Sequence, residues 1–160
     1  MFLLDTSVVF ALGRPLLEGA DPNLADWARR TPREDLFISA LTLLEIDAQA
    51  GRLMRKDRAG GSTVRDWLGE QVDKAFEGRV LPVDDKVARR RRDLAYADGR
   101  NGLLAATALE HGLTLVTREP AAFKAGRVKV FNPWTQTAAA MDWRQPQTSP
   151  LWLNYLFGRS

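Results

Sequence analysis

Five short apolar runs, separated by stretches whose apolar residues recur at helical spacing, constrain this chain more than any other feature. Each run is too short for a helix and is followed by polar or turn-forming residues, which is typical of a buried strand. We predict strands at 2–4, 36–39, 80–83, 113–117 and 128–131. We predict helices directly after Asp5, at 40–53, at 63–76 with Gly78 as its end, from 84 or 85 to before Gly99, at 103–110 and at 120–124. This alternation favours the α/β class, with helices on both faces of a parallel sheet.

The composition excludes several classes of protein. With 160 residues the chain fits one domain, and 45% hydrophobic residues are typical of a globular protein. It has no Cys and one His, which excludes Cys-ligated zinc and argues against a Ser-His-Asp triad, so a metal site would rest on carboxylates. The first apolar run has no basic residues before it and is interrupted by Asp5. No apolar run approaches the roughly 20 residues of a membrane span, so we expect a cytoplasmic protein without membrane contact.

Arginine supplies most of the positive charge, and the pI is near 9.6 although the net charge is only +3. The cations gather in two clusters, Arg89, Arg90, Arg91 and Arg92 in one and Arg52, Arg55, Lys56 and Arg58 in the other. The planar guanidinium suits phosphate, so nucleic acid is a candidate partner. A charge run is also usual on a solvated helix face, and the sequence leaves both interpretations open.

Polar side chains follow the predicted strands at the sheet edge where ligand sites of open α/β sheets lie. Asp5 comes directly after the first strand, and Asn101 starts a helix. Thr117, Arg118 and Glu119 close the fourth strand. Because the carboxyl ends of parallel strands meet at one edge, we expect these side chains to converge.

A further acidic residue, Glu45, interrupts the apolar segment LTLLEI. We expect Leu41, Leu44 and Ala48 to point inward, which would hold the Glu45 carboxylate near the sheet edge. Converging carboxylates repel one another, and a divalent cation is the usual compensation. Each residue also has a simpler interpretation, because Asp5 can be a helix cap and Glu45 a surface residue.

Five segments stand in a fixed order along residues 1–134: FLLDTSVV, ISALTLLEIDAQAG, RVLPVDDKVARR, NGLLAATALEHGLTLVTRE and FKAGRVKVFNPW. Together they resemble the PIN-domain ribonucleases of the VapC type, and especially their FitB-like branch. The resemblance implies a three-layer α/β/α PIN-like sandwich, with a central parallel sheet of four to five strands, over residues 1–134. It also implies a metal-dependent endoribonuclease that uses Mg²⁺ or Mn²⁺, acts as the toxin of a toxin–antitoxin pair, binds RNA and a cognate antitoxin, and forms a homodimer.

The resemblance assigns roles to individual residues of the site. Asp5 in LLDTS matches the first metal-binding aspartate, and Thr6 the hydroxyl residue that supports it. Glu45 in LLEI matches the second acid, and Glu119 takes the place of the fourth. Asn101 stands where the family has its third aspartate, so one carboxylate of the expected set is missing. Among the remaining residues of the set, Thr117 is expected to support the site, and Arg89, Arg90 and Arg118 to contact RNA.

The missing carboxylate affects the expected activity more than the expected fold. Asn101 offers only a neutral oxygen, so we expect metal binding and cleavage to be weakened or lost in this sequence. Asp98, three residues earlier, would partly substitute if the segment were helical. Two further positions depart from the family pattern, with Ala122 in place of an acid and Ser7 in place of a common Asn.

Other interpretations stand beside the nuclease. One is a catalytically dead PIN protein that acts by binding RNA or an antitoxin. A phosphatase-like enzyme with Asp5 as nucleophile lacks the second aspartate, because Ser7 stands there. A plain regulatory α/β module explains neither Glu45 nor Glu119. Outside the site, His111 is expected to end a helix, Trp27 and Trp67 to lie in the core or an interface, and the aromatic extension 135–160 to pack on the domain or a dimer partner.

Overall fold

The computed structural model describes residues 1–13 and 21–135. At its centre lies a sheet of five parallel strands in the spatial order β3-β2-β1-β4-β5. The strands are β1 (Phe2–Leu4), β2 (Leu36–Ser39), β3 (Val80–Leu81), β4 (Thr114–Val116) and β5 (Val130–Phe131). Strand β1 takes the central position because its apolar side chains are buried on both faces.

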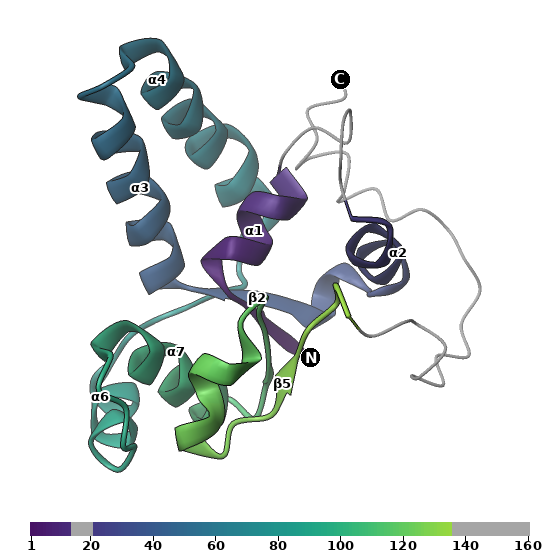
Figure 1. Ribbon diagram of the computed structural model, residues 1–160, viewed down its shortest axis with the longest axis vertical. Coiled ribbons are helices and arrows are strands. Elements are labelled where there is room, and N and C mark those ends of the chain that lie inside the picture. Colours follow the sequence, from purple (N-terminus) through teal and green to yellow (C-terminus); the bar gives the residue numbers. More distant parts are fainter. Residues whose placement is uncertain (14–20, 136–160) are drawn as a thin grey trace.

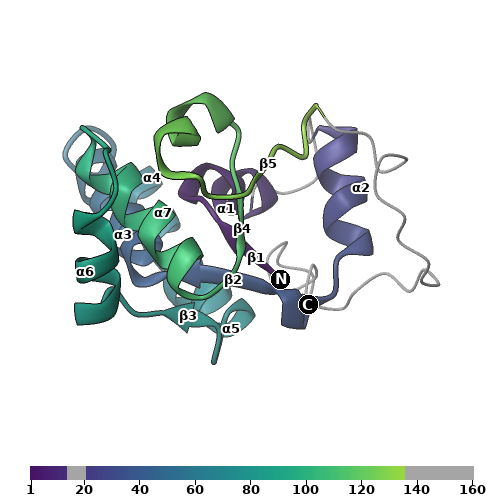
Figure 2. The same cartoon turned by 90° about the horizontal axis from the view of Figure 1, so that it is seen from below.

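Helices cover both faces of the sheet (Figures 1 and 2). The α-helices are α1 (Thr6–Gly13), α2 (Pro22–Arg30), α3 (Ala40–Met54), α4 (Arg58–Trp67), α5 (Asp73–Ala75), α6 (Asp85–Arg92) and α7 (Gly99–Glu110). Shorter turns are the 3-10 elements η1 (Arg33–Asp35) and η3 (Pro120–Gly126) and the π-helical turn η2 (Leu68–Val72).

The core is divided by the sheet into two clusters. Phe2 and Leu4 of β1 belong to the cluster under α1 and α2, whereas Leu3 belongs to the cluster under α7 and η3. This alternation follows from the two-residue period of a strand, which sends successive side chains to opposite faces. The predicted three-layer α/β/α sandwich is therefore confirmed.

Helix α2 was not among the predicted helices, and the other elements differ from the predicted ones mainly at their ends. Strand β3 has only two residues because only two residues of β2 pair with it. Helix α4 begins at Arg58, earlier than predicted, because the Asp57 carboxylate accepts a hydrogen bond from the Gly60 N–H and caps it. Gly78, predicted to end this helical stretch, follows it with a φ of 72°, the left-handed conformation that glycine favours.

Helices α3 and α4 form a hairpin that projects away from the sheet (Figure 1). They approach closely because Gly61 has no side chain, and a Cβ there would overlap the backbone of Met54. Within the part of the chain that the structure describes, no helix is long and apolar enough to cross a membrane.

The buried face of α3 differs from the predicted one. Its buried residues are Thr42, Ile46 and Ala50, because the helix packs on α1 and α4 through this face. The side chain of Leu44 is 68% exposed and Ala48 is exposed as well, so the prediction that they point inward was wrong. Of the predicted face, only Leu41 packs against the core, where it contacts the cluster under α7.

Several single-residue predictions are confirmed. Trp27 is buried, and Trp67 packs against the same core cluster, so both indoles are core residues. His111 forms the C-cap of α7. The prediction that the extension packs on the domain concerns residues 135–160, which lie outside the described residues except for Thr135.

Candidate functional site

A pocket of about 1680 Å³ opens at the carboxyl edge of the sheet. Asp5 enters it directly after β1, and Glu45 enters it from α3, the helix that follows β2. Arg100 lies in the first turn of α7, and Arg118 and Glu119 follow β4. The chain therefore brings together side chains that are far apart in sequence, as the parallel topology predicts.

Asp5 is the most buried of these carboxylates, with a residue exposure of only 5%. Its Oδ1 accepts a hydrogen bond of 2.7 Å from the Ser7 N–H, and its Oδ2 accepts one of 2.7 Å from the Thr117 hydroxyl. The first contact caps α1, and the same carboxylate lines the pocket, so a cap role does not exclude a site role for Asp5. Thr117 supports Asp5, the role that the sequence analysis gave to Thr6.

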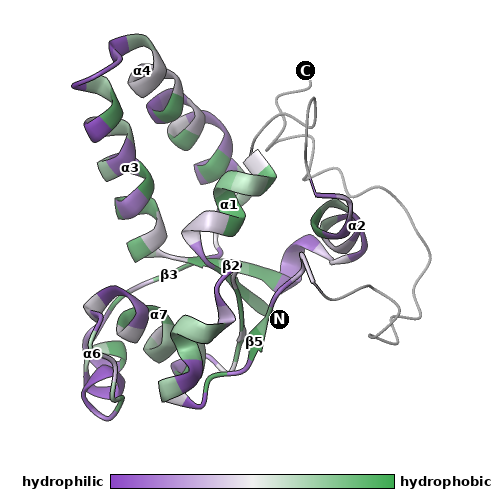
Figure 3. Ribbon diagram, in the orientation of Figure 1, coloured by the Kyte–Doolittle hydropathy of each residue, from purple (hydrophilic) through white to green (hydrophobic). Residues whose placement is uncertain are grey.

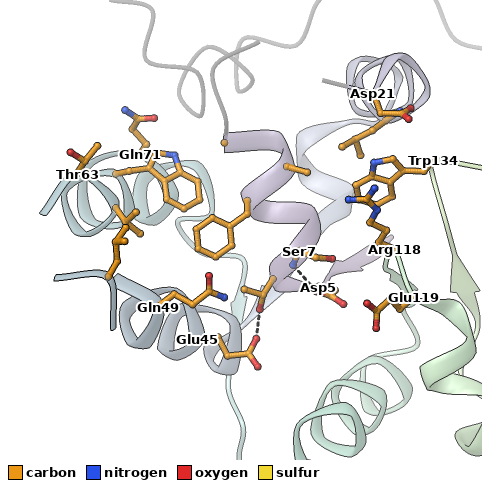
Figure 4. Close-up of a pocket in the computed structure, with 18 of the residues that line it drawn as sticks. Asp5, Ser7, Asp21, Glu45, Gln49, Thr63, Gln71, Arg118, Glu119 and Trp134 are labelled. Atoms are coloured by element: carbon orange, nitrogen blue, oxygen red, sulfur yellow. Dashed lines mark hydrogen bonds between the residues drawn. The ribbon is translucent and has the colours of Figure 1, made fainter. Parts of the chain in front are cut away.

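Glu45 lies half-buried on α3 beside the first turn of α1 (Figure 4). Its Oε2 accepts a hydrogen bond from the Thr6 hydroxyl, and its Oε1 accepts one from Arg100 Nε. Thr6 therefore supports the second acid, whereas the sequence analysis assigned it to the first. Both oxygens of Glu45 are fixed toward the pocket, so a surface role for this residue is wrong.

Arg100 joins the site residues to one another. Its Nη2 lies 3.3 Å from Asp5 Oδ1, its Nε donates to Glu45 Oε1, and its Nη1 donates to Asn101 Oδ1 at 2.9 Å. Burial opposes the positive charge of the guanidinium, but the hydrogen bonds and charges of Glu45 and Asp5 outweigh it and raise the pKa of Arg100 above its ordinary value. A permanent positive charge thus lies between the two carboxylates.

Asn101 and Asp98 take part in the start of α7. Asp98 is the N-cap, and its Oδ1 accepts a hydrogen bond of 2.7 Å from the Asn101 N–H. The segment after Asp98 is helical, but the carboxylate is exposed and serves the backbone of its own helix. The Asp98 carboxylate therefore caps α7, and a role for it in place of the missing acid stays a prediction.

Glu119 and Arg118 form the other wall of the pocket. Figure 4 shows Glu119 on the opposite side of Asp5 from Glu45. Both Glu119 and Arg118 are exposed, and the Arg118 guanidinium lies 5.5 Å from the centre of the Trp134 ring. This cation–π contact holds a positive charge and an aromatic face side by side at the mouth of the pocket.

The arginine run of α6 lies outside the pocket, whose described lining includes no residue of that helix. Arg89 pairs with Asp85 at 2.6 Å, and Arg90 pairs with Glu110 at 3.0 Å. Arg91 donates to backbone carbonyl oxygens of the loop before α7. Three members of the run therefore have partners within the protein, and contact of Arg89 and Arg90 with RNA stays a prediction.

The fold and the acidic sheet edge together define a PIN domain. The PIN domain model matches residues 2–127, so the chain belongs to the PIN-domain family. Within it, the chain is 32% identical over 142 residues to toxin FitB of Neisseria gonorrhoeae, covering 84% of this chain and 99% of that protein. VapC ribonuclease Y4jK of Sinorhizobium fredii is 31% identical over 144 residues, 84% of this chain and 98% of that protein. The crystal structure of FitAcB from Neisseria gonorrhoeae is similar with a TM-score of 0.74 and 31% identity, covering 85% of this chain and 100% of that chain. The protein is thus a FitB-like member of the VapC branch.

The arrangement of the site does not fit the divalent ion that the family implies. Among residues 1–13 and 21–135, no group of three or more His, Asp or Glu side chains lies close enough together to hold a metal ion. Arg100 contacts oxygens of Asp5, Glu45 and Asn101, three of the four predicted ligands. A guanidinium on these oxygens competes with a cation for them, because both bind through oxygen lone pairs.

Arg100 is the site residue that the sequence analysis missed. The predicted helix began at Asn101, which left Arg100 in a loop with no assigned direction. The available signal was a positive charge directly before the position of the lost negative charge.

Proposed function

We propose that this protein is the toxin of a toxin–antitoxin pair, with a PIN ribonuclease site whose Mg²⁺- or Mn²⁺-dependent cleavage is weak because a guanidinium occupies the cation position. One observation carries the proposal, namely the contacts of Arg100 with Asp5, Glu45 and Asn101. A ribonuclease of this family needs uncompensated carboxylates for its metal. Here Arg100 neutralises part of the site's charge, and Asn101 supplies none.

The pocket supports RNA as the ligand and the relatives support a protein partner. The Arg118–Trp134 pair offers a cation beside an aromatic face, a combination that suits unstacked bases and phosphates. The similar solved structures include FitAB bound to an IR36 DNA fragment, with a TM-score of 0.73, 30% identity, and coverage of 85% of this chain and 97% of that chain. By analogy, this toxin assembles with a FitA-like antitoxin in the cytoplasm, and it forms a homodimer that sedimentation would detect.

Single-turnover cleavage of a labelled single-stranded RNA with Mn²⁺ tests the proposal. The unchanged chain cleaves slowly, and the double variant Arg100→Gln/Asn101→Asp, which restores the acid and removes the guanidinium, cleaves at least about a hundredfold faster, a gain of about 2.7 kcal/mol in transition-state stabilisation. Asp5→Asn in that background abolishes the gain. The matched control Arg118→Gln removes one positive charge from the same pocket, leaves the carboxylates alone and gives no such gain.

The same assay distinguishes the second candidate, a PIN protein that acts by binding alone. The Arg100 contacts favour it as well, because a site without a free cation position still offers RNA a cation and aromatic surfaces. If every variant binds RNA and none cleaves it, the protein has this binding role and the proposed nuclease activity is wrong. Neither binding nor cleavage by any variant contradicts both.

A further inference from the structure

The turn between α3 and α4 and the helix ends beside it carry four cationic side chains, which we call the hairpin tip: Arg52, Arg55, Lys56 and Arg58. All four are exposed. Figure 1 shows the tip at the end of the projecting hairpin, distant from the sheet, and the ribbon of the connection between the two helices has the hydrophilic colour in Figure 3. The tip is therefore the part of the described chain that extends a concentrated positive charge farthest from the core.

The cations of the hairpin tip have no partner within the described residues. No ion pair or side-chain hydrogen bond involves any of them, although Arg89 and Arg90 of α6 each have a carboxylate partner. The acids near the tip are already engaged, because Asp57 caps α4 and Asp47 pairs with Arg65 at 3.2 Å. Unpaired, exposed cations keep their full capacity to bind an external anion.

The hairpin tip continues the wall of the pocket. Glu45, Gln49 and Leu53 of α3 line the pocket at intervals of four residues, so they share one helix face. Arg52 lies next to Leu53 at the end of this face. From Glu45 to Arg55 the helical rise is about 15 Å, the length of about four to five nucleotide steps of 3.4 Å. A strand that reaches the carboxylates can thus contact the tip at the same time.

Aromatic side chains of α1 and α4 line the same pocket as the carboxylates. Phe10 and Trp67 line the pocket and stack on each other with ring centroids 5.4 Å apart. Cations that follow aromatic faces along a groove are typical of single-stranded nucleic acid binding. An acidic peptide would use the cations of the tip alone, whereas an RNA strand would also use the pocket whose wall the tip continues, so the observations favour RNA.

We propose that the hairpin tip binds the phosphate backbone of the RNA strand whose other part lies at the carboxylates. The inference rests on the proposed RNA-directed function and adds the surface that supplies most of its electrostatic affinity. The contacts are sequence-independent, because phosphates carry no base information. The arginine run of α6 contributes less, because Arg89 and Arg90 are paired with carboxylates of the protein.

Two double variants with equal charge change test this surface. Arg55→Gln/Lys56→Gln alters the hairpin tip, and Arg89→Gln/Arg90→Gln alters α6, so each lowers the net charge by two. The affinity of each for a fluorescein-labelled 20-nucleotide oligouridylate is measured by anisotropy between 50 and 200 mM NaCl with EDTA, so that cleavage does not consume the probe. Each lost phosphate contact should lower the steepness of log affinity against log salt by about 0.7, so the tip variant, which loses two contacts, should have a slope flatter by about 1.4. Over this range the unchanged chain then loses about sevenfold more affinity than the tip variant.

The outcomes separate this inference from the proposed function. Suppose that RNA binding by the unchanged chain depends on salt, but the two variants have equal slopes or only the α6 variant has a flatter slope. The inference about the hairpin tip is then wrong, and the RNA-directed function is unaffected. An unchanged chain that does not bind the oligonucleotide at 50 mM NaCl overturns both. If the tip variant loses binding to poly-L-glutamate while its RNA slope is unchanged, the tip serves an acidic protein partner and the inference is wrong.

Discussion

Replacing Arg100 by Gln should destabilise the protein although this residue lies in a ligand pocket. The side chain of Asp5 is only 7% exposed and that of Glu45 is 20% exposed, so both carboxylates lose a charged partner in a partly dehydrated place. Removing one partner of a buried ion pair costs about 3–5 kcal/mol. The Arg100 side chain is itself 34% exposed, and solvent screens its interactions, so we expect a loss of about 2 kcal/mol.

Urea unfolding at pH 7 with EDTA measures this loss. The pKa of Arg100 is raised in the folded state, so its contribution is fully present below the unfolded-state pKa and is lost only as the pH rises through the folded-state value, far above pH 7. The control is Arg90→Gln, which breaks the exposed pair with Glu110 and should cost about 0.5 kcal/mol. Equal losses for the two variants would refute the reasoning, because the Arg100 contacts would then be no stronger than a surface pair.

Three further perturbations test other parts of the account. Burial raises the pKa of Tyr96 more than its backbone hydrogen bond lowers it, so the stability contribution of Tyr96 is full below pH 10 and is lost as the pH rises through the raised pKa. In urea unfolding measured against pH, Tyr96→Phe should remove this alkaline loss of stability, and a pH profile equal to that of the unchanged chain would contradict the prediction. Leu44→Gln should change the free energy of unfolding by less than about 0.5 kcal/mol, whereas Ile46→Ala should cost about 2–5 kcal/mol. A larger loss for Leu44→Gln than for Ile46→Ala would mean that Leu44 is buried, as the sequence analysis predicted. Asp98→Ala should lower the free energy of unfolding by about 1 kcal/mol, because it removes the cap of α7. Added to the Arg100→Gln/Asn101→Asp variant, it should leave Mn²⁺ binding unchanged, and weaker Mn²⁺ binding would identify Asp98 as a ligand.

The strands were predictable because their signal is local. A run such as Phe2–Leu4 is apolar at every position and is followed by a polar residue, so a strand buried on both faces of a parallel sheet is the structure that fits it. The face of α3 was not predictable in the same way. Leu41, Leu44 and Ile46 put apolar residues on more than one side of that helix, and the packing of α1 and α4 selects the buried side.

The acids that line the pocket were predictable, but their connections were not. Asp5, Glu45 and Glu119 line one pocket, as expected from strand ends and from the family resemblance. The contacts of Arg100 depend on where α7 begins: a helix that starts at Asn101 leaves Arg100 in a loop, whereas the cap at Asp98 puts it in the first turn. Ion pairs between distant elements, such as Arg90 with Glu110, leave no local trace in the sequence either.

The central claim is that Arg100 takes the place of the cation between Asp5 and Glu45. Calorimetric titration of Mn²⁺ into the unchanged chain and into Arg100→Gln/Asn101→Asp tests it most directly. The account predicts that the double variant binds Mn²⁺ at least about a hundredfold more tightly, about 2.7 kcal/mol in binding free energy, and that Asp5→Asn removes this binding. Binding by the unchanged chain as tight as by the double variant would contradict the claim, because the carboxylates would then hold a metal in spite of the guanidinium.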